Sequence, residues 1–448
     1  MSFRVSFFNN QIFKDVSTLF SGSVIAQFIG FAFLPVLTRL FLPEEFGVFY
    51  LFLTTASILS LIATGGYEKS FVLTKSDNDA RHLLLFSLLL SAVVTILSFL
   101  IILFLQQFGD KLFQSGQNRL ILWLIPVYSY LFGLFRIFQN WSIRNRNFKM
   151  VSGSNIIRSG SLSVLQSGFG LVNAGAPGLI SGSCLSQVFS LLFLIRKEKE
   201  TIGKFSKESL RAANGKGKEY RSFPFFKMPS DLLNEVSIQL PVYVIATFFS
   251  NAITGIYTFP QKIMSQPSKF ISQAVGEVYY RRASEIYSQN KDLSDLSFKT
   301  FKTLFITGIV PFVITMLWGQ EIFAFVFSKE WEQSGKIAAL LSPWILFVFA
   351  GSPVTYIFLI KRKLRLSFIL NLILLLVRAT ALLTGCLIFK DLEITVILFA
   401  GVSFIYWIWI SFYSLHLCGV NTGRALFFTV SVILITLVPL GLLKLFIW

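Results

Sequence analysis

Thirteen long apolar stretches dominate this chain and leave only short polar segments between them. A helix needs about 20 apolar residues to cross the roughly 30 Å hydrocarbon core of a bilayer. Stretches of that length lie at 16–38, 46–66, 82–105, 119–141, 151–172, 176–195, 229–250, 254–276, 300–318, 336–360, 366–388, 393–416 and 425–447. We therefore predict an all-α polytopic membrane protein with 12 to 14 spans.

Two of these stretches are more polar than the rest. The stretch 151–172 is rich in Ser and Gly, and 254–276 contains Pro260, Lys262, Pro267 and Lys269. Polar and helix-breaking residues are tolerated at membrane depth where a helix faces other protein or a hydrated cavity. Both stretches are therefore predicted to line such a cavity.

Composition excludes a soluble protein. Hydrophobic residues make up 54% of the 448 residues, and 29 Gly add to that share, whereas a soluble domain holds roughly 45–50% with Gly included. The 40 Lys and Arg against 22 Asp and Glu give a net charge of +18. Because these cations sit mainly between apolar stretches, they indicate membrane topology and contact with lipids, and no nucleic acid partner is predicted.

The cations also predict the orientation. With the N-terminus in the cytoplasm, 28 Lys and Arg fall in inner segments, 7 fall in outer segments and the other 5 lie within spans. Basic residues accumulate on the cytoplasmic side of membrane proteins. We expect a multi-pass protein of a bacterial inner membrane with a cytoplasmic N-terminus.

The sequence has few residues that could bind a metal ion or a cofactor. The three cysteines, Cys184, Cys386 and Cys418, lie in apolar stretches without a CxxC motif or a nearby His. The two histidines, His82 and His416, lie at span ends. We predict no metal site, no disulfide framework and no cofactor, and no enzymatic activity.

An internal repeat divides the chain. Phe41, Gly47 and Phe49 recur 208 residues later as Phe249, Gly255 and Tyr257, and Pro126 and Pro343 each precede a basic triplet by 18 residues. We predict a six-helix lobe at 1–195, a basic cytoplasmic linker at 196–228, a second six-helix lobe at 229–417 and an additional span at 418–448. Six spans per repeat make the repeats parallel, with a pseudo-two-fold axis along the membrane normal, and transporters of this design bind substrate between the halves.

The chain resembles a known family at several motifs. The segment LTRLFLPEEFGVF (37–49) looks like the signature after the first helix of oligosaccharide (Wzx-type) flippases, and GGYEKSFVL (65–73) is similar to their motif after span two. The most similar stretch begins YRSFPFFKMPSDLLN (220–234) and continues through Gly276. These flippases belong to the multidrug/oligosaccharidyl-lipid/polysaccharide exporter superfamily.

The resemblance covers 13–390 and implies a function. It implies that undecaprenyl-pyrophosphate-linked oligosaccharide moves from the cytoplasmic to the periplasmic leaflet for O-antigen or other surface polysaccharide synthesis. Two lobes would open alternately to each side, and polysaccharide polymerase and chain-length machinery are candidate partners. The thirteenth span departs from the family's usual twelve.

Cations within spans are the candidate substrate site, because a charged residue at mid-membrane is costly without a role or a partner and a pyrophosphate needs cationic partners. The candidates are Arg378, Lys262, Arg158, Arg136, Lys269 and Arg39. Arg378 lies near the middle of its span. Arg136 and Arg158 could equally extend toward headgroups, Lys269 is nearer the inner boundary, and Arg39 could anchor the end of span one beside Glu44 and Glu45.

Three carboxylates are candidates for ion coupling or gating: Glu68, Asp231 and Glu235. Asp231 and Glu235 are four residues apart at the start of span seven, where acidic residues also complement the helix dipole. Glu68 next to Lys69 could form an interfacial ion pair.

Two other functions are compatible with the same spans. A drug or cation exporter of the same superfamily would need buried carboxylates, whereas the charges within these spans are basic. A polysaccharide polymerase would need a large outer loop, and the longest predicted outer segment is about 319–335.

Overall fold

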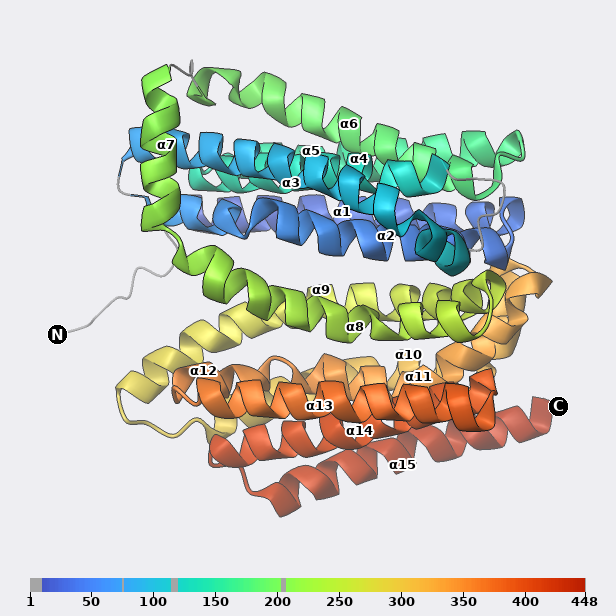
Figure 1. The fold of residues 1–448 in the computed structure, drawn as a ribbon. Helices are drawn as coiled ribbons and strands as arrows, with labels where there is room; N and C mark the ends of the chain where they lie inside the picture. The colour runs from blue at the N-terminus through green and yellow to red at the C-terminus, as the bar shows by residue number, and fades with distance from the viewer. Residues whose placement is uncertain (1–9, 75, 114–119, 203–206, 448) are drawn as a thin grey trace. The chain divides into compact units, whose positions relative to one another are not determined.

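The computed structural model describes residues 10–74, 76–113, 120–202 and 207–447, and every regular element in these ranges is helical. By internal contacts the chain forms two compact units, Met1–Thr247 and Phe248–Trp448. The elements of the first unit are α1 (Asn10–Leu40), α2 (Pro43–Thr64), η1 (Tyr67–Leu73), α3 (Asp77–Phe113), α4 (Leu120–Arg144), α5 (Phe148–Leu171), α6 (Gly175–Ile202), α7 (Lys207–Glu219), η2 (Phe223–Lys227) and α8 (Met228–Phe248) (Figure 1).

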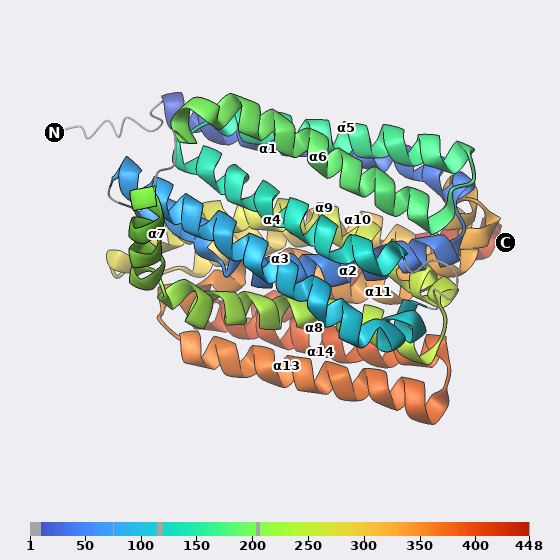
Figure 2. The same ribbon diagram turned by 45° about the horizontal axis from the view of Figure 1, so that its top comes forward.

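The second unit continues with helices of the same kind. Its elements are α9 (Asn251–Ser288), α10 (Ser294–Phe327), η3 (Lys329–Trp331), α11 (Glu332–Gly351), η4 (Val354–Tyr356), α12 (Ile357–Ile360), α13 (Leu364–Thr384), η5 (Gly385–Phe389), α14 (Leu392–Leu417) and α15 (Thr422–Ile447). Within this unit α13 lies alongside α14 (Figure 2).

The predicted all-α membrane fold is confirmed. Ten helices of the described chain are long and apolar enough to cross a membrane. Three further helices of at least 20 residues, α5, α8 and α9, match the remaining predicted stretches. They are less hydropathic because α5 is rich in Ser and Gly, while α8 and α9 carry prolines and charges.

Two turns of the first unit recur in the second. Arg146, after α4, has φ +58°, and Arg362, after α12, has φ +54°. In each turn the next N–H donates to a carbonyl five residues back: Asn147 to Ser142 at 2.8 Å and Lys363 to Phe358 at 2.7 Å. The turns before α6 and α14 share the left-handed backbone geometry, with φ +54° at Asn173 and +51° at Lys390.

One central helix occupies the same position in each unit. α4 packs against α2, α3 and α6, and α11 packs against α9, α10 and α14. Each contains one internal proline, Pro126 in α4 and Pro343 in α11. The matched turns and packing support the predicted repeat, and the symmetry axis that relates the two halves stays a prediction.

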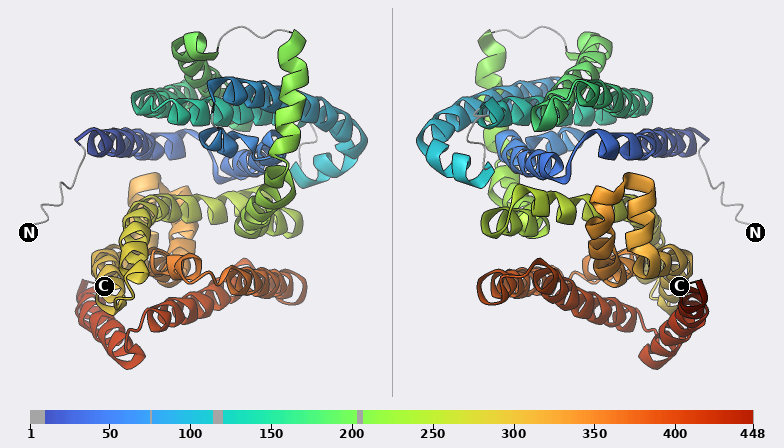
Figure 3. Two further views of the ribbon diagram at one scale, coloured as in Figure 1. Left: turned by 90° about the vertical axis from the view of Figure 1, so that its left-hand side faces the viewer. Right: turned by 90° about the vertical axis from the view of Figure 1, so that its right-hand side faces the viewer.

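The linker between the repeats is ordered over α7. This helix crosses the ends of α3 and its neighbours (Figures 1 and 3). The Tyr67 hydroxyl donates to the Gly217 carbonyl at 3.0 Å, and Lys216 pairs with Asp79 at 3.1 Å. Hydrogen bonds from Lys216 to Glu219 and to Asp79 raise the pKa of this lysine above its usual value. The α7 part of the linker is therefore bound to the rest of the first unit by these contacts.

Helix α8 also packs in the first unit, through a polar stripe. Residues 231, 235, 239 and 243 share one helix face because they are four apart. Asp231 pairs with Lys69 at 2.6 Å, and the Tyr243 hydroxyl donates to Thr55 Oγ1 at 3.1 Å. The start of the second repeat at 229 stays a prediction, and by internal contacts α8 belongs to the first unit, which ends at Thr247.

The thirteenth long helix, α15, is fastened to α10 at both ends. Near its start, Phe428 packs on Phe298 and Phe305 with ring centroids 5.7 and 6.3 Å apart. Near its end, Lys444 pairs with Glu321 at 3.4 Å and donates to the Leu317 carbonyl. That carbonyl precedes Trp318, where α10 departs from helical geometry. Since α10 and α15 both belong to the second unit, α15 is an integral part of it.

Candidate substrate site

The six predicted cations are divided evenly between the units. Arg39, Arg136 and Arg158 lie on α1, α4 and α5 of the first unit, while Lys262, Lys269 and Arg378 lie on α9 and α13 of the second. Their surroundings differ sharply, and these surroundings decide which of them can accept a ligand.

Arg378 is the most buried of the six, at 5% exposure. Its Nε donates to Ser403 Oγ of α14 at 2.9 Å. The guanidinium lies 5.0 Å from the ring centroid of Trp344 on α11 and 5.3 Å from that of Phe399 on α14. Three helices therefore hold one cation against a pair of aromatic rings, which themselves pack edge-to-face with centroids 5.4 Å apart.

No carboxylate of the described chain forms an ion pair with Arg378. Its electrostatic neighbours are two tyrosines, Tyr257 and Tyr406. A guanidinium has five N–H donors, and of these only Nε has a hydrogen-bond partner among the described residues. A buried charge without a counterion costs several kcal/mol, so this position favours an anion.

Further buried donors near Arg378 lack partners. The Tyr257 hydroxyl and the Trp344 indole N–H have no hydrogen-bond partner among the described residues, and Tyr257 is 1% exposed. Tyr257 is an electrostatic neighbour of Arg378, and the Trp344 ring lies beside its guanidinium. The surroundings of Arg378 are therefore richer in unpartnered donors than in anionic acceptors.

The two lysines of α9 differ in exposure. Lys262 is half-buried and follows the buried Pro260, whereas Lys269 is exposed beyond Pro267. Proline removes a backbone donor and leaves the carbonyl four residues earlier without its helical partner. Lys262 therefore lies in an irregular, polar part of α9, and Lys269 lies toward solvent or headgroups.

Arg136 is held by an acid of the same unit. Its Nη2 lies 2.7 Å from Glu68 Oε1, and the Glu68 side chain is fully buried. The sequence suggested Lys69 as the partner of Glu68, and the substrate site or lipid headgroups for Arg136. The structure pairs Glu68 with Arg136 and Lys69 with Asp231. Arg136 is therefore already neutralised.

The other acidic candidates form contacts along α8. Asp231, in the first turn, also pairs with Lys227 at 2.6 Å. Glu235 accepts from Gln239 Nε2 at 3.0 Å and from Ser57 Oγ at 3.4 Å. Asp231 thus has two cationic partners, whereas the hydrogen-bond partners of Glu235 are neutral.

Arg158 and Arg39 have weaker contacts. Arg158 is half-buried 5.7 Å from the Phe135 ring centroid, and its Nε has no hydrogen-bond partner among the described residues. Counted from the matched Arg146 and Arg362 turns, Arg378 lies four residues, about one helical turn, further into its helix than Arg158. Arg39 is exposed and donates to the Pro35 carbonyl of its own helix at 3.2 Å, as expected for an anchor.

Several residues of the Arg378 site were missed by sequence reasoning. Ser403, Trp344 and Tyr257 come from three different helices, and none has a distinctive motif. Trp344 directly follows Pro343, the proline matched across the repeats, which was the single available signal.

Comparisons with known proteins agree on the fold. A multidrug resistance MATE family transporter of the MOP superfamily, in an inward-facing conformation, aligns with a TM-score of 0.66 at 14% identity over 89% of this chain and 98% of that chain. The lipid II flippase MurJ, inward closed, aligns with a TM-score of 0.69 at 12% identity over 95% and 98%. A point mutant of the Vibrio cholerae MATE transporter VcmN aligns with a TM-score of 0.53 at 13% identity over 91% and 96%. No curated protein matches the sequence.

The fold and the buried cation therefore define a multi-pass membrane protein built like the MATE transporters and MurJ. The family model "Polysaccharide biosynthesis protein" matches residues 36–336. The chain belongs to this polysaccharide biosynthesis family.

Proposed function

We propose that this protein is a flippase that moves an undecaprenyl-pyrophosphate-linked oligosaccharide from the cytoplasmic to the periplasmic leaflet by alternating access. The observation that carries the proposal is Arg378, a buried guanidinium for which the described chain provides no carboxylate partner. A pyrophosphate diester carries about two negative charges, and it loses its hydration at great cost unless cations meet it. When a buried cation binds an anionic head group, the free-energy cost of desolvating each charge is reduced.

The membership of the polysaccharide biosynthesis family supports a saccharide cargo. The fold shared with a lipid II flippase supports a lipid-linked one. The runner-up, an exporter of drugs or cations, would use free carboxylates in the spans. Glu68 and Asp231 are instead paired with Arg136 and with Lys69 and Lys227. Glu235 is the one acidic candidate whose hydrogen-bond partners are neutral, so the balance of charge in the spans still favours an anionic cargo.

Deletion of the gene tests the proposal. We expect the surface polysaccharide to disappear while the lipid-linked oligosaccharide accumulates in the cytoplasmic leaflet, because nothing else would carry its charged head across the hydrocarbon. Accessibility of the oligosaccharide to an added glycosidase or lectin in spheroplasts and in inverted vesicles measures the leaflet. If the unit still reached the outer leaflet and only its polymerisation failed, the protein would act as a polymerase.

The direction of transport depends on the orientation. In a variant with Cys184, Cys386 and Cys418 replaced, we expect a cysteine at Asn214 of α7 to react only from the cytoplasm. A cysteine at Glu332, at the start of α11, should react only from the periplasm, because 28 basic residues are predicted inside against 7 outside. Labelling of whole cells and of inverted vesicles with a membrane-impermeant maleimide measures this, and the opposite pattern would reverse the topology.

A further inference from the structure

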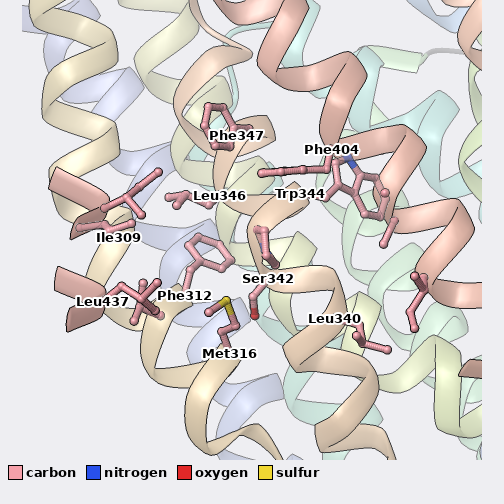
Figure 4. Close-up of a pocket in the computed structure, with 16 residues that line it drawn as sticks. Ile309, Phe312, Met316, Leu340, Ser342, Trp344, Leu346, Phe347, Phe404 and Leu437 are labelled. Atoms are coloured by element: carbon pink, nitrogen blue, oxygen red, sulfur yellow. The ribbon is translucent and has the colours of Figure 1, made fainter. Parts of the chain in front are cut away.

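A cavity of about 390 Å³ lies between α10, α11, α14 and α15 of the second unit (Figure 4). Its lining is almost entirely hydrocarbon and aromatic, and includes Ile309, Phe312, Phe404 and Leu437. Of the 16 residues that line it, Ser342 and Trp344 alone carry a side-chain oxygen or nitrogen. Its volume falls in the range of small-molecule sites.

One face of α14 contributes small residues to the cavity wall. Ile397, Ala400, Gly401 and Phe404 lie on one helix face, because their spacing follows three- and four-residue steps. Small residues in membrane helices normally allow a neighbouring helix to approach closely. Gly401 does not serve that purpose, since a Cβ at this position would meet no atom within 4 Å. Its small size instead keeps space open.

The way α15 is fastened preserves this space. Its ends are held on α10 by Phe428 and by Lys444, as described above. Between these ends, Ile433 and Leu437 of α15 face the cavity. The middle of α15 thus forms one wall of the cavity.

Charge lies next to this apolar cavity. Trp344 lines the cavity, and the ring of the same residue lies 5.0 Å from the Arg378 guanidinium. Arg378 has no carboxylate partner in the described chain. A hydrocarbon chain that ends in an anionic group therefore fits the pair, with the chain in the cavity and the charge toward the guanidinium.

We propose that this cavity binds one segment of the polyprenyl chain of an anionic carrier lipid, covered by α15 as part of the transport site. The inference rests on the proposed function, which supplies a substrate with such a chain. Burial of each CH₂ group stabilises binding by enough to change affinity about fourfold. A protein side chain that fills part of the cavity excludes several CH₂ groups of the lipid, and the affinity for the lipid falls accordingly.

The matched variants Gly401→Leu and Gly441→Leu test it on the full-length protein. Neither glycine has an atom within 4 Å of its added Cβ, and Gly441 lies on α15 outside the lining. We expect Gly401→Leu to lower binding of undecaprenyl phosphate at least tenfold in native mass spectrometry. Gly441→Leu should leave binding unchanged, and binding of phosphatidylglycerol should be unaffected in both. Equal binding of undecaprenyl phosphate by both variants would overturn the inference, as would a parallel loss of phosphatidylglycerol, which would make the cavity an ordinary lipid site.

A second measurement uses the wild-type chain and needs no variant to fold. A polyprenyl phosphate with a photoreactive diazirine in its chain should cross-link to the cavity-lining positions of α10, α14 and α15, and an excess of undecaprenyl phosphate should suppress the adducts. Adducts confined to other helices would refute the assignment. Both readouts measure binding alone, so the cavity could fail while leaflet transfer is intact, and leaflet transfer could fail while the cavity binds.

Discussion

Arg378→Ala and Arg378→Met are expected to lower transport of the lipid-linked oligosaccharide at least tenfold while the protein stays abundant and inserted. A hydrogen bond to a charged group contributes about 1.5–3 kcal/mol, and each 1.4 kcal/mol corresponds to a factor of ten. Arg378→Met should not destabilise the second unit, because an apolar side chain of similar size avoids the desolvation penalty of a cation without a carboxylate partner. Arg378→Ala also leaves a cavity beside Trp344 and Phe399, so Arg378→Met is the deciding variant. Transport into everted vesicles, normalised to protein level, measures the effect.

The conservative variant and a second candidate cation, Lys262, sharpen this prediction. Arg378→Lys should keep partial transport if charge alone is needed, and little if the planar guanidinium must bind two oxygens at once. Lys262→Ala should also impair transport, whereas the exposed Lys269 on the same helix gives the matched control, Lys269→Ala. A purely structural role for Arg378 predicts the reverse result: a less abundant protein whose remaining molecules transport normally.

The spans were predictable because the thickness of the bilayer sets a minimum apolar length. Even α5 and α9, the two polar helices, were found among the thirteen stretches, since each stretch is still long enough to cross the bilayer. The turns were less predictable. The basic triplets that contain Arg146 and Arg362 were matched in the sequence, but their left-handed backbone geometry, which Gly and Asn usually supply, appeared only in the structure.

The contacts of the candidate site were beyond sequence reasoning for a different reason. Arg378 was identified because a charge within a span is conspicuous. Its aromatic neighbours were not, because a chain with 51 Phe and 8 Trp offers many equivalent candidates. The same limit applied to Glu68, whose cationic partner is 68 residues away rather than adjacent.

Breaking the ion pair between Glu68 and Arg136 gives the second large predicted effect. Arg136→Met leaves the Glu68 carboxylate fully buried without its cation, and one of its oxygens, Oε2, already has no hydrogen-bond partner among the described residues. Breaking a buried ion pair from one side costs about 3–5 kcal/mol. We therefore expect a marked fall in membrane abundance and in the midpoint of thermal unfolding in detergent.

The double variant Glu68→Leu/Arg136→Met separates pairing from packing. Replacing both partners by apolar groups of similar size is often neutral, so the double variant should recover most of the stability that Arg136→Met loses. The matched control is Arg39→Met, which removes an exposed arginine bonded to its own helix and should change little. If the double variant were as unstable as Arg136→Met, the loss would come from the packing of the arginine stem against the elements around α4, and the ion pair would contribute little to the stability of the first unit.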